Sequence, residues 1–240
     1  MQETLQMIAL RTVAYADDRS ILSAYTRSRG FMSLLVRGGK GREASRRRAL
    51  LQPMSVVECV ADIVPGRDVS RIVSVRPLRP LHGVMSSPVK QTVAMFLAEV
   101  LGIVLRSNQP DAQTFDFVAQ SVAVLDELPR ERTANYHIAF LRGLAVCLGI
   151  EPDAGAYRSG MLFDMADGIW RLSAPLHNRW IGSDEARVAA ALCRMTYANM
   201  HLYSFDRAAR NAVLDRIMQF YSLHHTRLEG VKSLDILRSM

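Results

Sequence analysis

Residues 7–37, MIALRTVAYADDRSILSAYTRSRGFMSLLVR, contain three apolar runs separated by two short polar turns. The runs cover residues 7–15, 20–26 and 31–37. Short runs rich in β-branched and aromatic residues, joined by a few turn residues that include glycine, are typical of antiparallel hairpins. The stretch therefore predicts three consecutive strands.

Two further runs extend this pattern. Residues 54–63 (MSVVECVADI) follow Pro53, which is tolerated at the start of a strand, and residues 69–75 (VSRIVSV) follow a turn. Five short antiparallel strands in about 75 residues predict a small closed barrel, because closure removes the exposed strand edges. The segment RPLRP, residues 76–80, ends the pattern, so we place a domain boundary there and assign residues 1–80 to the barrel.

From Ser87 onward the apolar period becomes helical. Ser87 is a plausible N-cap with Pro88 at the first helical position. Apolar residues then recur at spacings of three and four, which predicts an amphipathic helix. Further helices are expected over residues 114–128, 133–148 and 207–224, after Ser183, and within residues 231–237. Residues 151–182 read as irregular, with a small hairpin of residues 161–164 and 168–172. The fold class is therefore α+β: a five-stranded barrel followed by an all-α helical domain, residues 81–240.

The excess positive charge of the chain lies entirely in the predicted barrel domain. Residues 1–80 carry 14 Lys and Arg against 7 Asp and Glu, whereas residues 81–240 carry 16 against 16. A basic cluster on an otherwise neutral protein indicates a polyanionic partner. Nucleic acid is the first hypothesis and an anionic membrane surface is the second.

The densest basic run falls in residues 37–48. We interpret residues 38–48 as a glycine-rich, basic loop that binds a polyanion, with a merely solvated charged connection as the alternative. Arg27 and Arg29 lie on the turn before the third strand, and we expect this turn close to the same region of the barrel. Tyr25 precedes that turn and is a candidate for base stacking, with a place in the barrel core as the alternative. Arg11 is a weaker candidate. The predicted DNA-binding residues are Tyr25, Arg27, Arg29, Arg37, Lys40, Arg42, Arg46, Arg47 and Arg48.

Several other classes of protein are disfavoured. Cys59, Cys147 and Cys193 are far apart and form no CxxC pair, which argues against a disulfide framework and a thiolate zinc site. We expect no metal and no cofactor. The chain shows no signal-peptide pattern and no long apolar run, so a soluble intracellular protein is expected. GxSxG, HExxH, GxxxxGK[ST] and GxGxxG are absent, which favours a binding protein over an enzyme. A metal-dependent nuclease with scattered carboxylates and a protein-binding scaffold remain the alternatives.

The order and spacing of several segments resemble the RecO family of recombination-mediator DNA repair proteins. No single segment is as specific as a metal-ligand motif, but together they span nearly the whole chain. These segments are IALRTVAYADDRSILSAYTRSRGFMSLLVRGGKG, LLQPMSVVE, MFLAEVL, NYHIAFLRGLAVCLGIEPD, MLFDMADG, SFDRAARN, YSLHH and KSLDIL.

The resemblance implies an N-terminal OB-fold and a C-terminal helical domain. It also implies binding of single- and double-stranded DNA, annealing of complementary strands and, with the partner RecR, loading of RecA onto strands coated by single-strand binding protein (SSB). The family binds the acidic, aromatic-ended SSB tail through its helical domain, which requires a cation beside an apolar cleft. A cytoplasmic, nucleoid-associated protein is implied. An RNA-binding OB-fold accessory protein is the rival, because the same cations would serve RNA.

The resemblance is incomplete in one respect. Many family members hold zinc with four cysteines in two CxxC pairs of the helical domain. Cys147 and Cys193 are single, and residues 157–172 contain no cysteine. The chain therefore resembles the zinc-free branch of the family.

Overall fold

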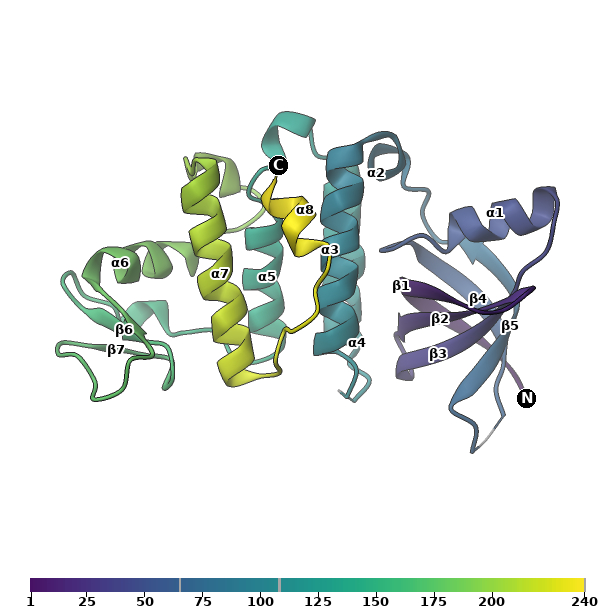
Figure 1. Ribbon diagram of the computed structural model, residues 1–240, viewed down its shortest axis with the longest axis horizontal. Coiled ribbons are helices and arrows are strands. Elements are labelled where there is room, and N and C mark those ends of the chain that lie inside the picture. Colours follow the sequence, from purple (N-terminus) through teal and green to yellow (C-terminus); the bar gives the residue numbers. More distant parts are fainter. Residues whose placement is uncertain (65, 108, 240) are drawn as a thin grey trace. The chain divides into compact units, whose positions relative to one another are not determined.

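Five strands form a closed barrel in the computed structural model, which describes residues 1–64, 66–107 and 109–239 (Figure 1). The strand order is β1-β2-β3-β5-β4, and β4 pairs with β1 to close the barrel. Only the β3–β5 pair among these five strands is parallel. This is the predicted five-stranded OB-fold. Its strands are β1(Gln2–Ala16), β2(Arg19–Thr26), β3(Gly30–Arg37), β4(Val56–Asp62) and β5(Val69–Pro77).

Alternate residues of each strand fill the barrel interior, as the twofold period of a strand requires. Leu22 and Ala24 on β2 face the same core as Leu34 and Val36 on β3. Cys59 belongs to this core, where burial raises the pKa of its thiol to about 11. That residue is a small core hydrophobe, as its isolation in the sequence suggested.

The segment predicted as a basic loop is partly helical. Helix α1(Arg42–Leu50) follows β3, and none of its residues is buried. Such a short polar helix has little stability of its own. It is anchored by Leu51, which belongs to the barrel core, and its terminal charges suit the helix dipole, with Glu43 in the first turn. The prediction of a loop over residues 38–48 is confirmed for residues 38–41 and was wrong for residues 42–48, because α1 carries no apolar stripe that the sequence pattern could show.

The chain divides into two compact units, and the first contains more than the barrel. Unit 1 comprises residues 1–133 together with the residues from Gly230 onward. Ser87 caps α3 as predicted, and its hydroxyl accepts from the backbone N–H of Lys90 at 3.5 Å. The backbone N–H and hydroxyl of Ser233 donate to the Glu99 carboxylate of α3 at 3.0 and 2.8 Å. Unit 1 contains α2(His82–Ser86), α3(Pro88–Val104), α4(Ala112–Glu127), η1(Arg130–Arg132) and α8(Leu234–Arg238).

Unit 2, residues 134–229, combines helices with a small sheet. The predicted hairpin is confirmed as β6 and β7, and an unpredicted strand, β8, pairs with the other edge of β6. None of the helices in the described part of the chain is long and apolar enough to cross a membrane. The elements of unit 2 are α5(Tyr136–Cys147), η2(Ala154–Ala156), β6(Leu162–Asp164), β7(Ile169–Arg171), β8(Trp180–Ile181), α6(Ser183–Leu192), η3(Met200–Leu202) and α7(Arg207–His224).

Candidate nucleic-acid interface and helical pocket

The arginines of α1 fall into two groups. Arg47 Nη1 donates to the carbonyl of Arg37 at 2.9 Å, and Arg48 Nη1 donates to the carbonyl of Gly39 at 3.4 Å. Arg47 also reaches Glu43 at 3.5 Å. These two side chains therefore hold the segment after β3 against the helix, and their charge contributes to the local field.

The second group points to solvent. Arg42 and Arg46 are exposed and four residues apart, so they lie on the same face of α1. Lys40 is exposed in the segment just before the helix, and Arg37 is exposed at the end of β3. These four exposed cations, all within ten residues of sequence, form the exposed basic surface of this segment.

Arg27 and Arg29 lie at the opposite end of β3 from this surface. Arg27 pairs with Asp116 at 2.7 Å and Arg29 pairs with Glu3 at 2.6 Å. The hydrogen bond to Glu3 raises the pKa of the Arg29 guanidinium. The eight residues of β3 separate the two ends by about 23 Å, at about 3.3 Å per residue. The sequence predicted that this turn lies close to residues 37–48. That prediction was wrong, because the length of β3 separates the two.

The Tyr25 ring is buried beneath helices on the outer side of the barrel and is not exposed. It pairs across the sheet with Ile8 and Phe31, and this row faces outward from the barrel, where α3 packs on β1 and β2. Only 1% of Tyr25 is exposed, and its hydroxyl bonds the backbone of Asp111, the N-cap of α4. Because the ring has no face open to a base, its prediction as a stacking residue was wrong.

A pocket of about 290 Å³ lies within unit 2. Arg142 and Arg216 line it, and each is paired with a carboxylate: Arg142 Nε with Glu151 at 2.9 Å and Arg216 Nη2 with Glu185 at 3.2 Å. This pocket was not predicted from the sequence. The one available signal was Arg142, a charged residue inside the apolar segment NYHIAFLRGLAV. The apolar walls of the pocket include Leu141, Phe163, Ile181, Val188, Ile217 and Phe220.

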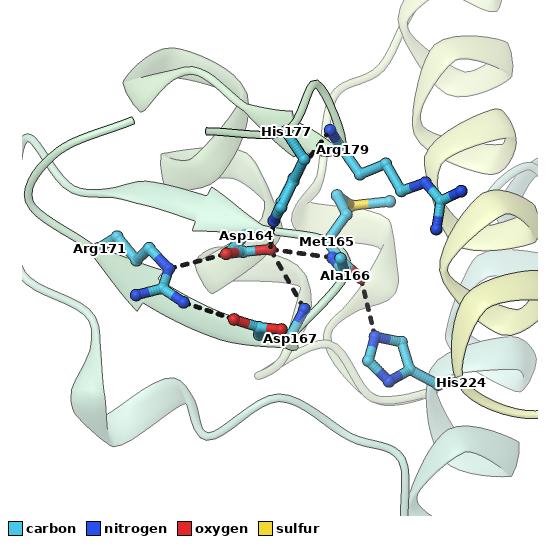
Figure 2. Close-up of polar contacts among 8 residues, drawn as sticks. All are labelled: Asp164, Met165, Ala166, Asp167, Arg171, His177, Arg179 and His224. Atoms are coloured by element: carbon cyan, nitrogen blue, oxygen red, sulfur yellow. Dashed lines mark hydrogen bonds and ion pairs between the residues drawn. The ribbon is translucent and has the colours of Figure 1, made fainter. Parts of the chain in front are cut away.

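A buried carboxylate organises the small sheet that forms one wall of this pocket. Figure 2 shows Arg171 and His177 converging on Asp164, whose side chain is fully buried. Asp164 accepts from Arg171 Nε at 2.7 Å and from the backbone N–H groups of Ala166 and Asp167 at 3.0 and 3.1 Å, and His177 Nε2 lies 3.4 Å away. Burial alone would raise the pKa of this carboxyl, but these hydrogen bonds outweigh it and hold the pKa below its ordinary value.

This network fixes residues on the pocket wall. Phe163 and Met165 flank Asp164 in the sequence, and both line the pocket. The Met165 carbonyl also lies 2.8 Å from His224 Nε2 on α7 (Figure 2). Among the residues that the structure describes, no three His, Cys, Asp or Glu side chains are grouped so that they could hold a metal.

Comparison with known protein families covers both parts of the chain. The family model described as "Recombination protein O N terminal" matches residues 1–81, and the one described as "Recombination protein O C terminal" matches residues 85–235. The chain belongs to the RecO family. This membership assigns it to DNA repair and recombination, and it confirms the resemblance found in the sequence.

Curated RecO relatives match along nearly their full length. The chain is 33% identical over 240 residues to the DNA repair protein RecO of Phocaeicola vulgatus, covering 100% of this chain and 99% of the relative. It is 35% identical over 238 residues to RecO of Porphyromonas gingivalis, with 97% and 96% covered. RecO of Flavobacterium psychrophilum is more distant, at 22% identity over 242 residues, with 100% and 99% covered.

Proposed function

We propose that this chain is a non-catalytic recombination mediator that binds single- and double-stranded DNA and anneals complementary strands. With RecR, it would help to load RecA onto SSB-coated strands in the cytoplasm, at the nucleoid. The observation that carries the proposal is the exposed basic surface of Arg37, Lys40, Arg42 and Arg46. Cations there would neutralise phosphates of two strands and lower the repulsion that opposes annealing.

The pocket in unit 2 supports SSB as a partner. An apolar cavity suits the aromatic end of the SSB tail, and Arg142 and Arg216 stand beside it for the tail's carboxylates. Entering carboxylates would take the place of Glu151 and Glu185. Partly exposed ion pairs of this kind are worth only about 0–1 kcal/mol, so the exchange costs little.

A strand-annealing assay tests the proposal. Complementary oligonucleotides coated with the cognate SSB are mixed with the protein across a salt series. Each phosphate contact contributes about −0.7 to the logarithmic salt slope of single-strand binding. The four outward cations contribute about −3 to this slope, and participation of Arg47 and Arg48 would bring the contribution of this segment to about −4.

Absence of both annealing and salt-sensitive DNA binding would refute the proposal and assign the basic surface to another polyanion. Direct competition between DNA and RNA of the same sequence then separates the mediator from an RNA-binding accessory protein, because nothing in the cation set distinguishes the two backbones.

A further inference from the structure

The outer face of the barrel is covered at one end and open at the other. The covered end is the row Ile8–Tyr25–Phe31, which lies under α3. Toward the tip of the β1–β2 hairpin, residues 11–16 of β1 are all exposed, so α3 does not extend over this part of the face. Strands normally keep one face apolar and one polar, so this stretch is expected to be polar.

It is instead lined by aliphatic side chains. The register places Val13 opposite Ile21 and Ile21 opposite Leu35, so these three aliphatic side chains form one row across β1, β2 and β3. Arg71 on β5 lies opposite Leu35 and ends the row, which at 4.7–4.9 Å per strand runs about 14 Å from Val13 to Arg71. Val13 is 47% exposed, and Ile21 and Leu35 are half-buried.

Exposed arginines border this row on β1, β2, β3 and β5. Arg11 lies on β1, Arg19 on β2, Arg37 on β3 and Arg71 on β5, and all four are exposed. Two of them have acidic neighbours: Arg19 lies 3.7 Å from Asp18 and Arg71 lies 3.5 Å from Asp62. Exposed pairs at these distances contribute little, so a phosphate can replace the carboxylate.

Tyr15 completes the surface. The register passes from Ala14 opposite Ser20 to Ala16 opposite Arg19, so Tyr15 is the extra residue of a β-bulge. Bulges redirect a side chain out of the regular pleat. Tyr15 is 67% exposed at the hairpin tip, the opposite situation from Tyr25.

We propose that this open face, with Tyr15 as the stacking residue, binds the unpaired bases of single-stranded DNA while the bordering arginines contact its phosphates. The inference rests on the proposed DNA-binding function and deepens it. An apolar row with an exposed aromatic ring can stack against bases whose faces are free, whereas in a duplex these faces are already stacked on one another. Tyr15 thus distinguishes single from double strands, whereas the cations of α1 serve both.

The test compares two DNA ligands with matched variants of the full chain. Fluorescence anisotropy measures the affinity for a labelled oligo-dT and for a labelled hairpin duplex. Tyr15→Ala is expected to weaken oligo-dT binding about tenfold, toward the lower end of the range for a base–aromatic stack, and to change duplex binding less than about twofold. Tyr15→Phe retains the ring and should restore oligo-dT binding. Met85→Ala removes a side chain that is 54% exposed on α2 and serves as the control.

The outcomes are distinguishable. Oligo-dT binding that is unchanged in Tyr15→Ala, or that falls together with duplex binding, overturns the base-stacking assignment while DNA binding itself stands. Dissociation of an oligomer by Tyr15→Ala, seen in sedimentation without loss of oligo-dT affinity, would make this face a contact between copies and also overturns it. If the unaltered protein binds neither ligand, the proposed function has failed, and the inference fails with it.

Discussion

The two groups of arginines on α1 make a quantitative prediction. Arg42→Ala combined with Arg46→Ala removes two exposed cations, whereas Arg47→Ala combined with Arg48→Ala removes two that bond the carbonyls of Arg37 and Gly39. Both double variants lose the same formal charge. They differ in that Arg47 and Arg48 also bond backbone carbonyls of the segment before the helix, at 2.9 and 3.4 Å, whereas Arg42 and Arg46 are exposed.

The magnitude follows from counterion release. A slope of about −0.7 per contact corresponds to a factor of about five per contact at 0.1 M salt, relative to 1 M. The Arg42 and Arg46 pair therefore contributes about 25-fold in single-strand affinity at 0.1 M salt, and its removal reduces the slope by about 1.4. The Arg47 and Arg48 pair should leave the slope nearly unchanged, and the looser helix should be cut faster by trypsin at Arg42 and Arg46.

Anisotropy titrations of oligo-dT between 0.05 and 0.4 M NaCl (roughly the range over which phosphate contacts dominate) give both slopes. Arg130→Ala combined with Arg132→Ala, exposed residues of η1, controls for overall charge. The division of α1 into bound and free cations is refuted by the reverse result. In that case the slope falls by about 1.4 in the Arg47 and Arg48 variant and stays that of the unaltered protein in the Arg42 and Arg46 variant.

Three further predictions follow from other contacts. Asp164→Asn should lower the melting temperature of unit 2. The folded-state pKa of Asp164 is depressed, so its stabilisation is complete above about pH 4 and is lost as the pH falls through the folded pKa. Calorimetry should therefore show that the difference in melting temperature between the unaltered protein and Asp164→Asn disappears in acid. Tyr25→Phe removes the hydroxyl contact with Asp111 and should cost about 1 kcal/mol in urea unfolding, with DNA affinity unaltered; a DNA-binding loss would show that Tyr25 does more than pack. Arg216→Ala should weaken an acidic, aromatic-ended SSB-tail peptide several-fold in calorimetric titration, compared with Arg187→Ala on α6; equal affinities would place the peptide elsewhere.

The barrel and the change to helical period were predictable because they rest on strong local patterns. Residues 20–26 and 31–37 form two short apolar runs separated by a turn, which is enough to indicate consecutive strands. Ser87 with Pro88 marks a helix start through backbone chemistry that acts within one turn. Features of this kind need no knowledge of distant residues.

The features that were missed depend on contacts far apart in the chain. Tyr25 is buried because α3 and α4 cover one end of an outer barrel face, which no pattern in residues 20–26 can reveal. Helix α1 is held by Leu51 and by arginine bonds to carbonyls, not by an apolar stripe. Strand β8 has two residues, fewer than any periodicity can register. Tyr15 is exposed at a β-bulge, whose position depends on the pairing of β1 with β2. The sequence of β1 alone therefore could not single out Tyr15 from its neighbours.

The return of the chain to unit 1 has a consequence for synthesis. Ser233 completes its bonds to Glu99 across 134 positions of sequence, with all of unit 2 made in between. A ribosome adding about 5–20 residues per second needs roughly 7–27 s for that distance. During this interval the surface of α3 that α8 later covers is bare on the nascent chain. Unit 1 therefore lacks part of its own structure until residues 230–239 have been made, although its strands are the first to be translated.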